Sequence, residues 1–201
     1  MACKSIKLSA ITTSCGSNVP SLKNIWVGAF DSVDWTFSYV QVPDPENPQQ
    51  TIDYVDEDGN KVIETITGAT LKTGADAFVE FGFRKNTCSA SSEMTVNDNG
   101  SHYFTNGINM VFAKQDAAKR LSIQALASGD CTAVYKDGNN NVWVIGVDAE
   151  ATLATATATT GTAVSDNNQY ELTLQEVAGI MPIPVNASNV DTVIEALTDA
   201  E

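Results

Sequence analysis

Alternating apolar and polar positions dominate this sequence and predict a succession of short β-strands. Residues 35–42 show the pattern most clearly, because Trp35, Phe37 and Tyr39 fall on one face and smaller side chains on the other. Comparable patterns predict further strands at 24–30, 51–55, 61–67, 77–83, 94–96, 108–113, 131–137, 141–147, 151–164 and 170–177, with an extended edge segment at 180–185.

Two segments follow helical spacing instead. Residues 114–128 carry apolar side chains at helical intervals, and Gly129 is expected to end this helix. Near the C-terminus, Ser188 is expected to cap a second, shorter helix. Its apolar stripe consists of Val190, Val193, Ile194 and Leu197. The predicted fold is therefore mainly β, a sandwich or barrel, with one packed helix and a short C-terminal helix.

The chain divides into one domain with an arm at each end. Residues 1–23 are polar and form the predicted N-terminal arm, 24–185 the single β-rich domain, and 186–201 the C-terminal arm and helix. A loop at 43–60 is expected to protrude, because Pro43, Pro45 and Pro48 cannot continue a strand ladder. The turn at 56–60 is expected to join 51–55 and 61–67 in a hairpin.

Charge restricts the classes of partner. The 201 residues include 11 Lys and Arg against 25 Asp and Glu, a net charge of −14. Proteins that grip nucleic acid neutralise phosphates with clustered basic residues, and anionic membranes also attract basic segments. This composition argues against both classes of protein.

The cysteines and the N-terminus indicate a cytoplasmic folding environment. Cys3, Cys15, Cys88 and Cys131 are widely spaced, so we expect free and mostly buried thiols rather than a disulfide framework. The first residues lack the apolar block of a signal peptide, and no segment is apolar enough to predict a membrane span.

Candidate catalytic and metal-binding groups are few. His102 is the single histidine, and it follows a turn without a nearby nucleophile motif. The acidic run that begins at Asp56 has Lys61 and Thr67 where a calcium-binding EF-hand needs Gly and Glu. Zinc-ligand spacings and phosphate-binding glycine loops are absent from the sequence. We predict no catalytic residue, metal or cofactor, although paired carboxylates remain open because they meet only in the fold.

Three features of the architecture are instead typical of self-assembly. They are the protruding loop, the terminal arms and the strand at 151–164, whose alternating Thr and Ala give it a hydroxyl face and a face of small side chains. Exposed strand edges pair readily with other chains. The combination predicts a self-assembling β subunit.

Several segments carry a resemblance to a known group of proteins. They are IWVGAFDSVD at 25–34, CTAVYKDG at 131–138, VWVIG at 142–146, and DNNQYELTL at 166–174, which follows the Thr/Ala run ending near Gly161. These segments resemble tail and other virion structural proteins of tailed bacteriophages, and most closely the tail tube proteins.

The resemblance implies a specific role. In tail tube proteins a β-barrel or sandwich with a flanking helix forms hexameric rings, which stack into a tube and are locked by loops and arms. By this resemblance the loop at 43–57, with Pro43, Asp44, Pro45, Glu46 and Pro48, would stack one ring on the next. The partners would be copies of this chain, other tail proteins such as the terminator, baseplate or tape measure proteins, and passing DNA. The protein would reside in the virion tail after assembly in the host cytoplasm, without membrane contact.

The acidic composition fits this role, because an acidic wall repels phosphate and keeps DNA mobile. The acids at Asp56, Glu57 and Asp58 are candidates for the lumen or its loops. Two alternatives remain. One is a head-decoration or head–tail joining protein. The other is a carbohydrate-binding β-sandwich, which would need exposed aromatic side chains, whereas the strand patterns place Trp26, Trp35 and Trp143 in the core.

Overall fold

A computed structural model describes residues 18–47, 49–56, 59–163 and 166–199. The elements are, in chain order, β1 (Leu22–Ala29), β2 (Val33–Tyr39), β3 (Gln41–Pro43), β4 (Thr51–Asp53), β5 (Ile63–Leu71), β6 (Val79–Glu80), β7 (Ser89–Val96), β8 (His102–Ala113), α1 (Ala117–Leu126), β9 (Cys131–Asp137), β10 (Val142–Ile145), β11 (Ala151–Thr159), β12 (Gln169–Ala178), β13 (Ile183–Pro184) and α2 (Val190–Thr198). The prediction of a mainly β fold with two helices is confirmed.

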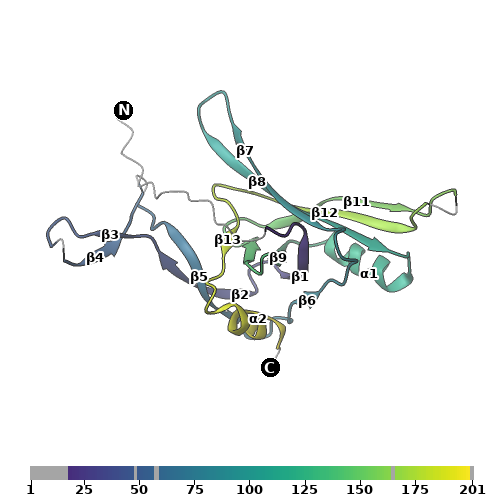
Figure 1. Ribbon diagram of the computed structural model, residues 1–201, viewed down its shortest axis with the longest axis horizontal. Helices are drawn as coiled ribbons and strands as arrows, with labels where there is room; N and C mark the ends of the chain where they lie inside the picture. Colours follow the sequence, from purple (N-terminus) through teal and green to yellow (C-terminus); the bar gives the residue numbers. More distant parts are fainter. Residues whose placement is uncertain (1–17, 48, 57–58, 164–165, 200–201) are drawn as a thin grey trace.

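The body is built in layers (Figure 1). One layer contains the strands β6, β1, β9, β10 and β13, in that order, and a second contains β11, β12, β8 and β7. The two meet at a corner, where Ala151 of β11 pairs with Cys131 of β9. On the other side of the first layer lie the β2–β5 hairpin and α2. The strand pairings are antiparallel throughout these layers.

The central layer is buried on both faces, which explains its nearly continuous apolar sequence. Residues 131–135 of β9 are all buried. Its alternate side chains enter different cores: Ala133 and Tyr135 face the β11–β12–β8–β7 sheet, whereas Val134 faces β5 and α2. A strand covered on both faces has no solvent side to mark with polar residues.

Two hydrophobic cores therefore stabilise the body. The core between the two sheets includes Ile25, Ile108, Met110, Leu172 and Leu174. The second core, beneath β5 and α2, includes Trp26, Ile66, Phe78, Val144 and Val193. Trp26 is 7% exposed, and Trp35 and Trp143 pack against the cores, so the core positions predicted for the three tryptophans are confirmed.

The two helices differ in how they pack. In α2, Val193 and Leu197 are fully buried against the body, which confirms the predicted apolar stripe. The prediction that Ser188 caps it is wrong, because the helix begins after Asn189, and the Ser188 amide instead donates to Asn186 Oδ1. Helix α1 begins after Asp116, whose side chain caps the Lys119 amide, and it is shorter than predicted. No residue of α1 is buried; only Ile123 and Leu126 pack against a core.

Several strand boundaries differ from the sequence patterns. The Ser-rich segment at 89–96 forms a full strand, where a loop with a short strand at 94–96 was predicted, and β8 begins at His102 rather than at 108. Residues 77–83 contain only the two-residue strand β6. Pairing of the whole of β7 with residues 102–109 of β8 supplies the strand geometry that the serines alone do not favour.

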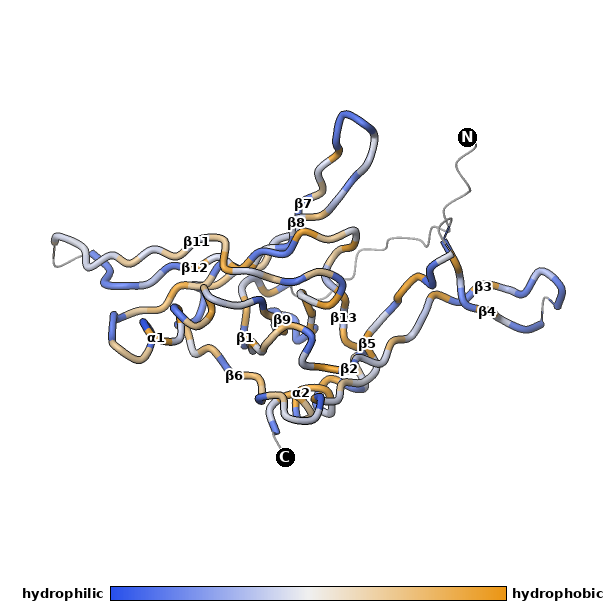
Figure 2. The backbone as a smooth tube through the Cα atoms, turned by 180° about the vertical axis from the view of Figure 1, so that it is seen from behind, coloured by the Kyte–Doolittle hydropathy of each residue, from blue (hydrophilic) through white to orange (hydrophobic). Residues whose placement is uncertain are grey.

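Three hairpins project from this body. They are β7–β8, β11–β12, and the extension of β2–β5 that ends in β3–β4 (Figure 1). The tips of β3–β4 and β7–β8 are hydrophilic (Figure 2). The projections are the first candidates for contact with other molecules.

Candidate functional site

One of these projections is the segment at 40–62, called the arm below, which continues from β2 and β5 (Figure 1). Three backbone segments meet at its base: the Tyr54 amide donates to the Val40 carbonyl at 2.7 Å, the Val40 amide to Val62 at 2.9 Å, and the Val62 amide to Tyr54 at 3.1 Å. From this junction β3 and β4 run outward as a separate two-stranded sheet. The described residues of the loop predicted at 43–60 thus include a hairpin.

The prolines do not prevent pairing in the arm, contrary to the prediction. Pro43 is the last residue of β3 and pairs with Thr51, and the next amide, of Asp44, donates to the Gln50 carbonyl at 2.9 Å. Proline is tolerated because each strand of this hairpin has a free edge. At the turn, Asp44 Oδ1 accepts the Glu46 amide at 2.9 Å, and Pro45 lies between them. Pro48 lies outside the described residues.

Of the three acids predicted for the lumen or its loops, Asp56 lies on a second turn of the arm. Asp56 Oδ1 accepts the Asn60 amide at 2.8 Å, whereas Glu57 and Asp58 lie outside the described residues. The hairpin predicted between 51–55 and 61–67 is reduced to a single bridge, between Val55 and Lys61. The strand β4 pairs with β3, and β5 pairs with β2, because the chain makes two turns here rather than one.

Electrostatic contacts hold the base of the arm in place. Lys61 Nζ lies 2.8 Å from Asp53 Oδ2 and 5.1 Å from the centre of the Tyr39 ring. The hydrogen bond to Lys61 lowers the pKa of Asp53, and the same bond raises the pKa of Lys61. The ion pair is exposed, so its role is to orient β4 against β5 rather than to add much stability.

The outer face of the β11–β12–β8–β7 sheet, called the polar face below, is the second candidate surface. The strand register places hydroxyl and amide side chains on it, whereas the opposite face contributes to the core. Its members include Ser89, Ser91, Thr95, Thr105, Asn109, Thr152, Thr155, Thr157, Thr173 and Gln175. None of its residues is buried, so within the described chain this face meets solvent.

The polar face has no positive charge. The four strands that form it contain no Lys or Arg, and the acids on it are Glu93 and Glu171. The hydroxyl face predicted for the strand at 151–164 is part of it: Thr155 and Thr157 pair across from Thr173 and Glu171. Such a surface offers hydrogen bonds but no cation to hold a phosphate group.

A buried carboxylate lies behind this face. Glu176 is 4% exposed; its Oε2 accepts Asn106 Nδ2 at 2.8 Å and its Oε1 accepts the Gly146 amide at 3.0 Å. Asn106 also donates to the Ile180 carbonyl and accepts the Ser92 hydroxyl at 2.6 Å. The network joins β12, β8 and β7 to the turn after β10 and fixes the corner where the two sheets meet.

Burial raises the pKa of Glu176, and the hydrogen bonds from Asn106 and Gly146 only partly offset this effect. The sequence analysis missed this residue. Its signal was present, because in the alternation of β12 Glu176 falls on the face of Leu172 and Leu174. A charged residue at a core position of an alternating strand indicates a buried polar network.

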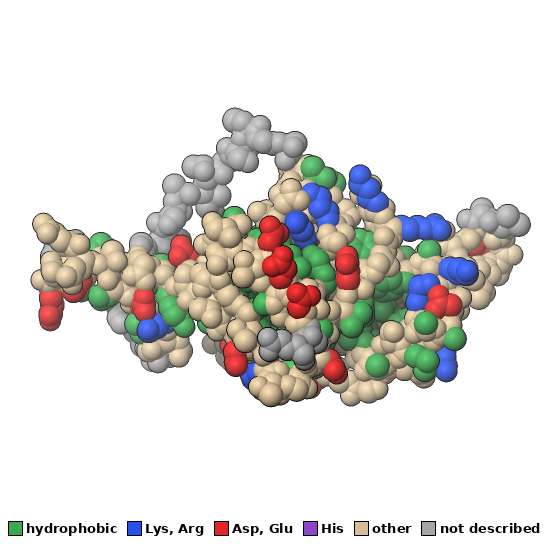
Figure 3. All heavy atoms as spheres, turned by 90° about the horizontal axis from the view of Figure 1, so that it is seen from below, with side chains coloured by type: hydrophobic (Ala, Val, Ile, Leu, Met, Phe, Trp, Pro, Cys, Tyr) green, Lys and Arg blue, Asp and Glu red, His purple; other side chains and the backbone are tan. Residues whose placement is uncertain are grey.

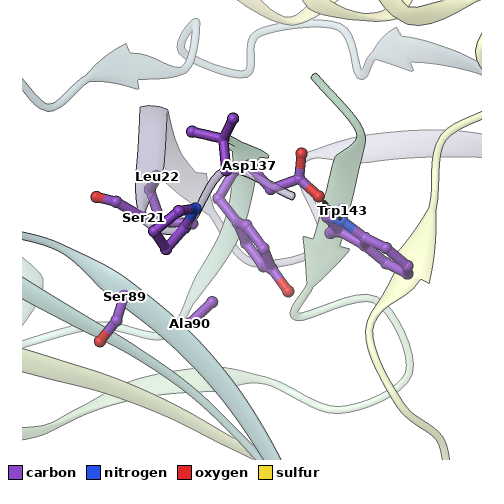
Figure 4. Close-up of a pocket in the computed structure, with 9 residues that line it drawn as sticks. Ser21, Leu22, Ser89, Ala90, Asp137 and Trp143 are labelled. Atoms are coloured by element: carbon purple, nitrogen blue, oxygen red, sulfur yellow. Dashed lines mark hydrogen bonds between the residues drawn. The ribbon is translucent and has the colours of Figure 1, made fainter. Parts of the chain in front are cut away.

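One pocket near the start of β1 has polar lining, but its groups serve the fold (Figure 4). It has a volume of about 290 Å³ and is lined by Val19, Pro20, Ser21, Leu22, Ser89, Ala90, Tyr135, Asp137 and Trp143. The Asp137 carboxylate accepts the Asn139 and Asn141 amides at 2.8 and 2.9 Å, and Trp143 Nε1 at 3.3 Å. These bonds fix the β9–β10 turn.

The remaining reactive groups are dispersed. His102 is exposed and packs edge to face against Phe104, with ring centres 6.3 Å apart. Cys88 and Cys131 are free and buried, as predicted for them, and burial raises the pKa of Cys131 to about 12. Cys3 and Cys15 lie outside the described residues. Among the residues that the structure describes, no three His, Cys, Asp or Glu side chains gather as a metal site would require.

Comparison with known proteins identified no relative of this chain. No protein family, no curated protein and no solved structure matches the chain. Within the described ranges, neither helix has the length and apolar character needed to cross a bilayer.

Proposed function

We propose that this protein is a non-enzymatic structural subunit that assembles with copies of itself into stacked rings, as the tail tube of a tailed phage does. The observation that carries the proposal is the polar face. It is a solvated sheet surface rich in hydroxyl and amide groups, with Val111 and Val177 also on it, that contains acids but no Lys or Arg. In the proposed rings this face lines the channel.

A wall of this composition suits the passage of DNA. Protein that neutralises phosphates releases counterions and binds DNA tightly, so a channel needs the opposite property. Glu93 and Glu171 repel phosphate, while the short hydroxyl side chains leave the surface smooth. The net charge of −14 supports the same interpretation.

The projections supply the means of assembly. The arm carries the proposed stacking residues Asp44, Pro45 and Glu46 at its tip, away from the body (Figure 1). The ends of β7–β8 and β11–β12 extend beyond the packed part of their sheet, so their strand edges are free to pair with neighbouring copies. Contacts with other tail proteins would use the two ends of the stack.

Electron microscopy of the purified protein, with its mass measured in solution, tests this proposal. Stacked rings or tubes with a central channel are the expected result. Trimers, or a single ring of twelve, would replace it with a head-decoration or head–tail joining role. A monomer at every concentration, in the presence or absence of a nucleating tail fraction, would overturn the assembly proposal.

A charge variant tests the channel assignment separately. Thr152→Lys/Thr155→Lys places two cations on the polar face, and assembled particles of this variant should retain double-stranded DNA in a salt-dependent manner. The control, Gln124→Lys/Ala127→Lys, adds the same charge to exposed positions at the C-terminal end of α1. Equal DNA retention by both variants would contradict the assignment of the polar face to the channel wall.

A further inference from the structure

An apolar groove runs between β6 and α1, on the side of the molecule shown in Figure 3. Two adjoining hollows of about 240 and 420 Å³ form it, and both are lined by Val79, Phe81 and Ser122. Val79 is 60% exposed, although it belongs to a strand. Leu121 of α1, which lines neither hollow, is also 60% exposed.

The walls of this groove are incompletely packed. The strand β6 pairs with β1 through two residues only and forms the edge of its sheet. Helix α1 contains no buried residue among its ten. An amphipathic helix obtains most of its stability from packing of its apolar face, so an occupant of the groove would complete the packing of α1.

Basic side chains gather at the end of the groove near the start of α1. Five of the eleven Lys and Arg residues of the chain lie in the segments that flank this end: Arg84, Lys85, Lys114, Lys119 and Arg120. Lys119 lines the groove itself and forms an ion pair with Asp116; the lining also includes Glu80 and, in the larger hollow, Asp76 and Asp130. In Figure 3 blue side chains are concentrated around α1, whereas red ones gather over α2 and occur on the arm.

The arm has the complementary character. Residues 41–61 contain six acids, Asp44, Glu46, Asp53, Asp56, Glu57 and Asp58, against the single cation Lys61, which is paired with Asp53. Ile52 and Val55 are each 44% exposed on this segment. A two-stranded hairpin without further packing is marginally stable in water, so the arm also needs a surface to lie on.

We propose that the groove between β6 and α1 receives the arm of a second copy of this chain. Ile52 and Val55 enter the apolar hollows, and the acids of the arm face Arg84 and the basic residues of α1. The inference rests on the self-assembly proposed above and names the surface on which the arm docks.

The position of the two surfaces determines the kind of assembly. The arm lies at one end of the long axis of the molecule, and α1 lies toward the other end, on the side of the β11–β12 hairpin (Figure 1). A contact between two different surfaces of identical subunits is heterologous, and it propagates from copy to copy into a ring or a helical stack. One contact therefore accounts for an extended assembly and leaves the polar face uncovered.

Charge reversal tests the pairing. Asp44→Lys/Glu46→Lys in the arm and Arg84→Glu/Lys85→Glu beside the groove should each raise the concentration needed for assembly at least tenfold. A chain with all four substitutions should return toward the wild-type value, because the new charges are again opposite. Asp191→Lys/Glu195→Lys on α2 changes the net charge by the same amount as the arm variant and serves as its control. A fourfold variant no better than its parents would overturn the pairing.

Photo-cross-linking locates the contact without relying on charge. Val79 is replaced by photoreactive benzoylphenylalanine, ¹⁵N-labelled and unlabelled chains are mixed and irradiated, and adducts are mapped by mass spectrometry. Adducts between labelled and unlabelled chains are expected at residues 41–61, and none at this segment when Gln124 carries the probe. Rings whose adducts map elsewhere would reject the groove and leave the proposed function standing; a strictly monomeric wild type would reject both.

Discussion

The central strand β9 and the arm both consist of antiparallel β-structure, but β9 is buried inside the body and the arm projects from it. β9 pairs with β1 on one side and β10 on the other, and both of its faces are covered by a core. β3 and β4 pair only with each other and form a sheet of their own. The comparison indicates that the body supplies most of the folding free energy, whereas the arm has little packing of its own and, in the proposed assembly, would gain it from a second copy.

The difference in packing between the body and the arm is also seen at two glycines, Gly146 in the body and Gly59 in the arm. Gly146 and Gly59 both have a positive φ, of 81° and 89°. A Cβ on Gly146 would lie 2.6 Å from the Cys131 carbonyl oxygen and 2.8 Å from Thr132 Cα, whereas a Cβ on Gly59 would meet nothing within 4 Å. The left-handed backbone disfavours a side chain at both positions, but only the body adds a steric clash with backbone atoms.

The largest effect is therefore expected from Gly146→Ala. Backbone strain and overpacking together should lower the free energy of unfolding by about 3 kcal/mol or more. Gly59→Ala should lower it by at most about 1 kcal/mol, because the strain stays within the arm. Urea denaturation followed by tryptophan fluorescence measures both. Equal losses would mean that the arm and the body unfold as one cooperative unit.

The next effect concerns two glutamates of β12. Glu176→Ala leaves the Gly146 amide without its partner in a buried network, and we expect a loss of about 2–4 kcal/mol in unfolding free energy. Glu171→Ala on the exposed polar face should change it by less than about 0.5 kcal/mol. The same denaturation experiment compares them, and a small loss for Glu176→Ala would show that the network contributes little to the corner.

A smaller effect is the pH dependence that Glu176 imposes on the body. Burial raises its pKa above the ordinary value of 4.5, so the folded protein retains this proton at a pH where the unfolded chain has lost it. The stability contributed by this group is therefore present at low pH and is lost as the pH rises through the raised pKa. In Glu176→Gln this slope should disappear from the curve of unfolding free energy against pH. Parallel curves for the two proteins would contradict the assignment.

The strands of the body were predictable because packing there agrees with local pattern. The segments around β1, β9, β10 and β12 alternate or run apolar as their burial requires, and the stripe of α2 identified its packed face. The alternation of apolar and polar residues did not predict strands that are held by backbone pairing rather than by burial of side chains. The serines of β7 carry no apolar signal, and the prolines of the arm indicate a loop although Pro43 belongs to a strand.

The candidate surfaces were only partly visible in the sequence for a related reason. The alternating Thr and Ala of β11 indicated a hydroxyl face, but the contribution of β7, β8 and β12 to that face depends on their register. The groove could not be found at all, since β6 and α1 are separated in sequence and α1 was expected to be well packed. Surfaces formed by several elements follow from tertiary pairing rather than from periodicity.

The smallest effect is on amide hydrogen exchange in the arm, which is measured on the unmodified protein and involves no change in its global stability. In the monomer, amide hydrogens of β3 and β4 should exchange with solvent within seconds to minutes, because local opening of this hairpin exposes no core. Amides of β9 should exchange only through global unfolding. On assembly, protection should rise in the arm and around β6 and α1 and stay unchanged in β9, as mass spectrometry of deuterated peptides can measure. Slow exchange of the arm in the monomer would mean that contacts within its own chain already stabilise it, and the division between a self-sufficient body and a dependent arm would have to be abandoned.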